Sequence, residues 1–164
     1  MAAGPPVRDK TPEDQAWVER LLLERWGGKV IIVHGVPFDA ASLPALVAGD
    51  REGLATYPID EKAELISLDA VTPGCGVGTT LILELAQRLR SVGVRKLWVT
   101  TTNDNLSALR FYQRRGFRLA RVHAGAIDVA RRLKPAIPMF GQHGIPIRDE
   151  IDLYLCLCEP TAGN

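Results

Sequence analysis

Two short motifs in this 164-residue chain carry the residue types that could do chemistry. The first is the run Gly74-Cys75-Gly76-Val77-Gly78-Thr79-Thr80, which follows a hydrophobic segment and precedes an amphipathic one. Glycines let the backbone approach a ligand closely, and the first N–H groups of a helix are unpaired at the positive end of its dipole. The run therefore predicts a site for a phosphate or pyrophosphate.

The glycine run does not match the two commonest phosphate-binding motifs. No lysine followed by serine or threonine comes after its last glycine, which excludes a P-loop. No acidic residue at the right distance ends a second strand to hold a ribose, which argues against a dinucleotide-binding fold. What remains is a short strand–loop–helix cradle of backbone N–H groups.

The second motif is Asn105-Leu106-Ser107-Ala108-Leu109-Arg110-Phe111-Tyr112-Gln113-Arg114-Arg115-Gly116-Phe117. It resembles the pattern Asn-x-x-Ala-x-x-Phe-Tyr-x-x-x-Gly-Phe of the GNAT superfamily of N-acetyltransferases. Residues 73–78 resemble the acyl-CoA loop of the same superfamily, whose pattern is Gln/Arg-x-x-Gly-x-Gly/Ala. The resemblance covers residues 53–122. It implies an α/β fold with a mixed, mostly antiparallel twisted sheet of six to seven strands flanked by helices, and acetyl-CoA as the acyl donor without a metal.

The resemblance also implies which residues bind the donor. Asn105 would hydrogen-bond the pantetheine arm, and the backbone at 68–70 would pair with its amides and polarise the thioester carbonyl. Pro73 departs from the family pattern, because proline replaces a side-chain donor and has no backbone N–H. We expect a nearby arginine to support the phosphates instead. The full donor-binding set is Leu68, Asp69, Ala70, Gly74, Cys75, Gly76, Val77, Gly78, Thr79, Asn105, Ser107 and Tyr112.

Two residues are catalytic candidates through the resemblance. Tyr112 would protonate the departing thiolate as a general acid, or it is a buried tyrosine bonded to a backbone carbonyl. An amine is mostly protonated at neutral pH, so a base is needed. Glu64 matches the strand that carries the glutamate of histone-type members, and its alternative role is to orient the acceptor. Asp69 is a second candidate for the base.

The acceptor side is less well defined by the sequence. His34 and His143 are candidate bases on loops, and Asn103 is a candidate acceptor contact, although each also has a structural interpretation. Residues 124–150 form an insertion before the last strand, which predicts either a lid over the acceptor pocket or a structural cover. In the first case Asp149 and Glu150 would recognise a cationic substrate.

The function that these motifs predict is transfer of the acetyl group of acetyl-CoA to a primary amine by direct attack in a ternary complex. One alternative is a non-catalytic acyl-CoA-binding or sensing module, and another is a transferase that uses a different acyl-CoA. From the resemblance we also expect the protein to form a homodimer.

The elements that must position these motifs follow from hydrophobic periodicity and turn residues. A helix is predicted from Thr11 to Gly27, and further helices over 77–92, from Asn105 or Asp104 to Gly116, and over 126–134. Strands are predicted over 30–33, 43–48, 53–59, 63–71, 97–101, 117–122 and 151–158. We expect one domain over 11–158, a flexible N-terminal tail over 1–10 and a C-terminal tail over 159–164.

Composition gives little reason to expect other partners. The formal net charge is +1, from 20 basic and 19 acidic residues, which gives no electrostatic case for nucleic acid or for a membrane surface. The start lacks the apolar core of a signal peptide, so a cytoplasmic location is predicted. The three cysteines argue against a disulfide framework, and Cys156 and Cys158 are expected as small core residues.

Overall fold

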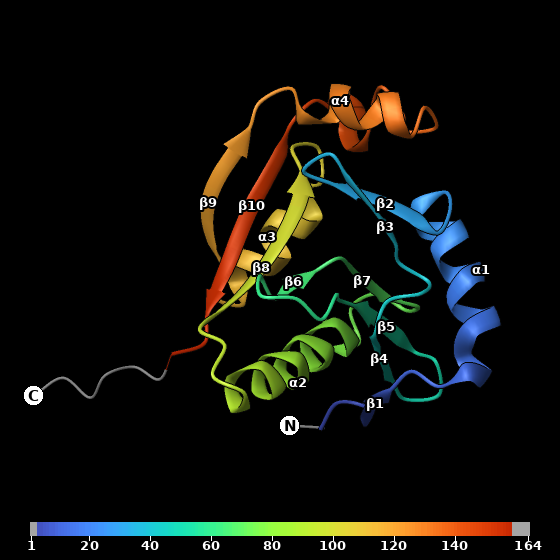
Figure 1. Ribbon diagram of the computed structural model, residues 1–164, viewed down its shortest axis with the longest axis vertical. Helices are drawn as coiled ribbons and strands as arrows, with labels where there is room; N and C mark the ends of the chain where they lie inside the picture. Colours follow the sequence, from blue (N-terminus) through green and yellow to red (C-terminus); the bar gives the residue numbers. More distant parts are fainter. Residues whose placement is uncertain (1–2, 159–164) are drawn as a thin grey trace, which may run out of the picture.

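The structure is a computed structural model that describes residues 3–158, so the predicted tail at 159–164 lies outside the described residues. Two four-stranded sheets lie side by side, with α2 beneath them and a β-hairpin between α1 and α4 (Figure 1). The elements are β1 Val7–Asp9, η1 Pro12–Asp14, α1 Gln15–Trp26, β2 Val30–Val33, β3 Val36–Asp39, β4 Ala45–Ala48, β5 Gly53–Thr56, β6 Glu64–Leu65, β7 Ser67–Ala70, α2 Val77–Ser91, β8 Lys96–Thr102, α3 Leu106–Arg114, β9 Arg118–His123, α4 Ala126–Leu133, η2 Gln142–Gly144 and β10 Glu150–Cys156.

The two sheets separate at Ile66. Before it, β6 pairs in parallel with β8; after it, β7 pairs antiparallel with β5. The strand orders are β1-β4-β5-β7 and β6-β8-β10-β9. The predicted mostly antiparallel α/β fold is confirmed, but the expected single sheet is two sheets, because the strand predicted over 63–71 is divided between them.

Two hydrophobic clusters hold the layers together. In the first, Leu81 and Leu85 of α2 pack against buried residues of both sheets, including Leu97 and Leu153. In the second, α1 packs its buried residues against the hairpin and the opposite face of β4 and β5. The helical spacing of apolar residues in 77–92 therefore fixes α2, and through α2 the glycine run at its start, against the sheets.

The expected flexible tail over 1–10 is wrong for part of its length. Val7–Asp9 forms β1, whose partner is β4. Asp14 explains why this part of the tail is structured. Its carboxylate is 1% exposed and accepts hydrogen bonds from Arg8 at 2.6 and 3.0 Å and from Arg51 at 3.1 Å. It also accepts from the backbone N–H of Thr11 at 2.9 Å, so one buried carboxylate joins β1, the start of α1 and the β4–β5 turn.

We expect Asp14→Ala to lower the free energy of unfolding by about 2–3 kcal/mol, because buried charge-assisted hydrogen bonds are lost. The Arg8 guanidinium, with Thr11 and Arg51, holds the pKa of Asp14 well below its usual range despite burial. The folded-state pKa is depressed, so the contribution is complete above about pH 4 and is lost as pH falls. Urea unfolding at several pH values checks this, with exposed Asp50→Ala as control. A difference between Asp14→Ala and the unmodified protein that grows at low pH would contradict it.

The strand predicted over 30–33 is present as β2, and it forms a hairpin with β3, for which no element was predicted. His34 and Gly35 form its two-residue turn with φ of 50° and 74°. Two successive positive φ angles are typical of a type I′ turn, which matches the twist of a hairpin. The turn projects the His34 side chain toward the sheet that contains β8 and β10.

The insertion packs against the hairpin and the end of α1, an arrangement that fits both the predicted lid and the predicted structural cover. Its backbone is organised by Arg131, which donates to the carbonyls of Pro138 at 2.8 Å and Ile147 at 2.6 Å. Lys134 Nζ donates to the carbonyls of Trp26 at 2.8 Å and Val30 at 2.7 Å. These contacts attach the insertion to the wall that the hairpin forms.

The cysteine prediction is wrong, because Cys156 and Cys158 are exposed while Leu157 between them is buried. β10 ends at Cys156, and the side chain that enters the core there is the leucine. Within residues 3–158, every helix is too short or too polar to span a lipid bilayer.

Candidate active site

Each of the three glycines of the first motif is required for its own structural reason. Gly74 and Gly76 adopt φ of 81° and 77°, in the left-handed region where a side chain is strained. Gly78 lies inside α2, where a Cβ atom would come 3.0 Å from Cζ of Phe111 in the second motif. The first two glycines therefore shape the loop, and the third lets the two motifs pack against each other.

A cleft of about 620 Å³ lies beside this loop and is called the glycine-loop cleft here. The structure brings all of the predicted donor-binding residues to its lining except Cys75, whose side chain is exposed outside it. The N-terminus of α2 faces the cleft through Val77, Gly78 and Thr79. Their backbone N–H groups are in the first turn of the helix, where they lack intrahelical partners and favour an anion.

The backbone of β7 offers hydrogen-bonding groups along another side of this cleft. The N–H of Val71 donates to the carbonyl of Glu52 at 2.9 Å, and alternate residues of an antiparallel strand face the same neighbour. By this alternation Asp69 pairs with β5, whereas the N–H groups of Leu68 and Ala70 face the open edge of the sheet. The open edge suits an extended ligand that contains amides.

Asn105 and Tyr112 line the same cleft from α3. The side-chain carbonyl of Asn105 caps α3 by accepting from the N–H of Ala108 at 3.1 Å, which leaves the amide Nδ2 available. The Tyr112 ring is buried between Phe111 and Phe117, and its hydroxyl has no hydrogen-bond partner within residues 3–158. Burial, with the charge of Asp69, raises the pKa of Tyr112, so the hydroxyl keeps its proton at neutral pH.

Arg115 lies next to the glycine run, where Pro73 leaves the family's side-chain donor missing. Its Nε donates to Thr79 Oγ1 at 2.7 Å, and its guanidinium stacks on Phe111 at 3.5 Å from the ring centroid. Burial and the charge of Arg114 lower the pKa of Arg115, and it forms no ion pair within the part of the chain that the structure describes. A half-buried guanidinium without a carboxylate partner is suited to an anionic ligand.

On the other side of α3 the basic surface continues. A second cleft of about 420 Å³ is lined by Arg110, Arg114, Arg115 and His143 and shares Ser107 with the glycine-loop cleft. His143 therefore lies beside donor-side arginines. Residues 141–145 fold back toward α3, which places His143 in this cleft and not with His34, the other histidine predicted for the acceptor side.

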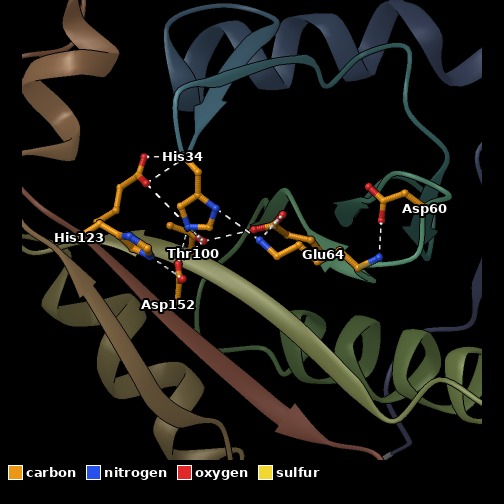
Figure 2. A network of polar contacts seen from close by, with 8 residues as sticks. His34, Asp60, Glu64, Thr100, His123 and Asp152 are labelled. Atoms are coloured by element: carbon orange, nitrogen blue, oxygen red, sulfur yellow. Dashed lines mark hydrogen bonds and ion pairs between the residues drawn. The ribbon is translucent and has the colours of Figure 1, made fainter.

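A set of polar side chains, called the polar network here, converges where the hairpin turn meets β8 and β10 (Figure 2). His34 Nε2 lies 2.7 Å from Asp152 Oδ1, and His123 Nε2 lies 2.7 Å from Asp152 Oδ2. Thr100 Oγ1 donates to Asp152 at 2.8 Å and reaches Glu64 at 3.3 Å. The members are His34, Lys62, Glu64, Thr100, His123, Glu150 and Asp152.

The polar network holds more negative than permanent positive charge. Glu64, Glu150 and Asp152 are 2–5% exposed, and Lys62 is the one permanent cation among the network's members. Burial raises the pKa of Glu150 more than the backbone N–H of His34 lowers it. Burial also acts on Asp152, but hydrogen bonds from His123, His34 and Thr100 outweigh it and lower that pKa. The network therefore favours a bound cation or proton.

The donor atoms of His34, His123 and Asp152 lie within 4.8 Å of one another and could ligate a metal ion. Ligand atoms around tetrahedral zinc, at about 2.0–2.1 Å from the metal, are about 3.3 Å apart. The two imidazole–carboxylate distances of 2.7 Å are shorter and match charge-assisted hydrogen bonds. The geometry is that of a hydrogen-bonded set.

Two further cavities lie near the polar network and the glycine-loop cleft. The junction cavity, of about 90 Å³, is lined by Ile66, Thr100, Asn105 and Glu150, and Asn105 also lines the glycine-loop cleft. The apolar cleft, of about 410 Å³, lies under the insertion. It shares five lining residues with the junction cavity: Trp26, Ile31, Ile32, Thr102 and Ile127. Glu150 is the carboxylate at the junction of the two clefts.

The structure separates the other candidates of the acceptor side. Glu64 lies in the polar network but lines neither the glycine-loop cleft nor the junction cavity. Asn103 fixes the insertion, because its Nδ2 donates to Pro146 O at 2.9 Å and its Oδ1 accepts from two backbone N–H groups. Asp69 accepts from Trp26 Nε1 at 2.9 Å, and burial raises its pKa.

Sequence reasoning missed Asp152 and His123. A signal was present, since Glu150 and Asp152 are acids two residues apart in an otherwise apolar strand, and such residues share one face of a sheet. His123 ends β9 opposite Glu150, so its contact with Asp152 depends on a strand pairing that only the fold reveals.

Comparison with known proteins identifies relatives of this chain. A profile of the Acetyltransferase (GNAT) family matches residues 64–117, which include β6, the glycine run and the whole of the second motif. The uncharacterised protein YxbD of Bacillus subtilis (strain 168) is 36% identical over 139 residues, or 82% of this chain and 87% of that protein.

Solved structures share the fold. A Bacillus subtilis acetyltransferase in complex with CoA aligns with a TM-score of 0.63 at 17% identity, over 94% of this chain and 99% of that chain. A GNAT family acetyltransferase from Elizabethkingia anophelis with acetyl-CoA bound aligns with a TM-score of 0.63 at 18% identity, with the same coverage.

Proposed function

Since the chain belongs to the GNAT acetyltransferase family, we propose that it transfers the acetyl group of acetyl-CoA to a primary amine. The observation that carries the proposal is the glycine-loop cleft, in which the N-terminus of α2, the open edge of β7 and the second motif share one lining. The solved neighbours that contain CoA or acetyl-CoA support this choice of donor.

Each polar part of acetyl-CoA has a matching set of protein groups in or beside the glycine-loop cleft. The pyrophosphate would accept from the N–H groups at the start of α2, with Arg115 in place of the missing donor at Pro73. The pantetheine amides would pair with Leu68 and Ala70 on the open edge of β7 and with Asn105 Nδ2. The basic second cleft beside α3 suits the remaining phosphate.

The chemistry needs a proton acceptor, an oxyanion site and a proton donor. The amine nitrogen attacks the thioester carbonyl, the C–N bond forms, and the C–S bond breaks as the electron pair leaves with sulfur. A backbone N–H of β7 stabilises the negative charge on the carbonyl oxygen. Tyr112 gives its proton to the thiolate, and its unpartnered hydroxyl supports this role over that of a hydrogen-bonded core tyrosine.

The amine's proton passes to Glu150. Its carboxylate lies at the junction of the two clefts, whereas Glu64 lies behind Thr100 with Lys62 at 3.2 Å. A raised pKa makes Glu150 a stronger base than an exposed carboxylate. Glu64, the base predicted from the sequence, remains the second candidate.

Incubation of the purified protein with acetyl-CoA and a panel of amines tests the function. We expect release of free thiol that depends on the amine, and an amine product that has gained one acetyl group. Tight acetyl-CoA binding without transfer to any amine would instead favour a binding or sensing module. Faster transfer from a longer acyl-CoA would favour another donor.

Arg115→Met is expected to raise the KM for acetyl-CoA about 10- to 100-fold, because hydrogen bonds to a charged group contribute about 1.5–3 kcal/mol. The kcat should change little, since the phosphates are bound equally in the ground and transition states. Steady-state kinetics checks this, with Arg118→Met as the control because Arg118 is exposed on β9 and lines none of these clefts. An unchanged KM in Arg115→Met would remove Arg115 from phosphate binding.

A further inference from the structure

The walls of the apolar cleft come from the end of α1, the hairpin, the end of β8 and the insertion. The hairpin contributes Ile31 and Ile32, α4 contributes Ile127 and Ala130, and the rest of the insertion contributes Ile137. Acidic side chains are missing from this lining within residues 3–158. A ligand that enters the cleft therefore exchanges water for apolar contacts and finds no carboxylate there.

The two charged side chains of the cleft are both positive. Arg25 donates to the carbonyl of Val71 at 3.2 Å. Lys134 is held by two backbone carbonyls, and burial lowers its pKa. A second ammonium group on an acceptor would lie among apolar side chains and near these two cations. Like charges at short range in a partly buried site repel each other, so a dication is disfavoured.

The opposite end of the same space is acidic. Glu150 is 2% exposed and lines the junction cavity, with Asp152 and Glu64 behind it in the polar network. The junction cavity thus favours one positive charge, and the apolar cleft, with which it shares five lining residues, favours an uncharged apolar group.

We propose that the acceptor is a primary amine with a single positive charge, carried on a compact aromatic or branched aliphatic body. This inference rests on the proposed function and names its substrate class. The amine would lie beside Glu150 in the junction cavity, and the body would fill the apolar cleft, whose volume of about 410 Å³ is typical of sites for small molecules. The same arrangement discriminates against polyamines and other multiply charged amines.

The experiment compares 2-phenylethylamine with 1,4-diaminobutane as acceptors at a fixed, saturating concentration of acetyl-CoA. We expect kcat/KM to be at least tenfold higher for 2-phenylethylamine. Ile137→Glu places a carboxylate in the half-buried wall of the cleft and is expected to reverse the preference, lowering kcat/KM for 2-phenylethylamine at least tenfold and raising it for the diamine. Ile32→Glu, on the hairpin wall, repeats the test from the other side.

Leu133→Glu is the matched control, because Leu133 is 55% exposed on α4 and lines none of these cavities. It should leave both kcat/KM values unchanged, and thermal unfolding and acetyl-CoA binding should show that every variant is folded. A preference of the unmodified protein for the diamine, or folded Ile137→Glu and Ile32→Glu variants that keep its preference, would overturn the inference while acetyl transfer stands. Transfer to neither amine by protein that acetylates another amine of the panel would overturn the inference alone, and binding of acetyl-CoA without transfer to any amine would overturn the proposed function together with it.

Discussion

Glu150→Gln is expected to lower kcat about 10²- to 10⁴-fold at neutral pH, with the KM for acetyl-CoA nearly unchanged. The reason is that Glu150 is the buried carboxylate at the junction of the donor and acceptor clefts, and a glutamine cannot accept the amine's proton. The amide oxygen still accepts from the His34 N–H, which lies 3.1 Å from the carboxylate, so the hairpin turn should keep its position.

The pH dependence separates this role from a structural one. Burial raises the pKa of Glu150, so the activity of the unmodified protein should fall as pH decreases through that raised pKa, where the base becomes protonated. In Glu150→Gln that inflection should disappear, and the deficit should shrink at high pH, where more of the amine is already neutral. A pH profile of kcat between pH 5 and 10 measures both effects.

Glu64→Gln provides the comparison. Glu64 contacts Thr100 and Lys62 rather than the junction cavity, so its loss of kcat should be smaller than that of Glu150→Gln. If Glu64→Gln shows the larger loss and removes the acidic inflection while Glu150→Gln retains it, the base is Glu64, as the sequence indicated.

The residues of the glycine-loop cleft could be predicted because they lie close together in the sequence. The glycine run and the second motif each occupy one loop–helix unit, so the spacing within the sequence is the spacing in the site. Gly74 and Gly76 have the positive φ that their residue type suggests, and Asn105 caps α3 as predicted. Cys75 is the exception, since a residue between two glycines of a tight loop points outward.

The acceptor side could not be predicted in the same way, because its residues meet through long-range packing. His34 reaches Asp152 only because the predicted strand at 30–33 turns back into β3, a strand that was not predicted. The division of the strand at Ile66 directs Glu64 and Leu68 to different sheets. Asn103 has the right residue type for a ligand contact, but the insertion uses its amide.

Tyr112→Phe is expected to lower kcat about 10²-fold or more at neutral pH, because the thiolate would leave without a positioned proton donor. The ring packs at 5.2 Å from Phe111 and 5.1 Å from Phe117, measured between centroids, and phenylalanine preserves both contacts. The hydroxyl has no protein partner within residues 3–158, so its removal leaves no buried group unpaired and the free energy of unfolding should change by less than about 0.5 kcal/mol. Loss of kcat without loss of stability is the result that a merely structural tyrosine would not give.

Tyr154→Phe is the matched control, because Tyr154 also packs its ring against an aromatic neighbour, Trp98 at 5.2 Å, but lines none of these cavities. Its kcat should equal that of the unmodified protein. Because burial raises the pKa of Tyr112, the hydroxyl keeps its proton up to about pH 10, so the deficit of Tyr112→Phe should stay constant over the alkaline half of the pH profile. An unchanged kcat in a folded Tyr112→Phe would mean that the thiolate leaves without help from this hydroxyl and takes its proton from solvent.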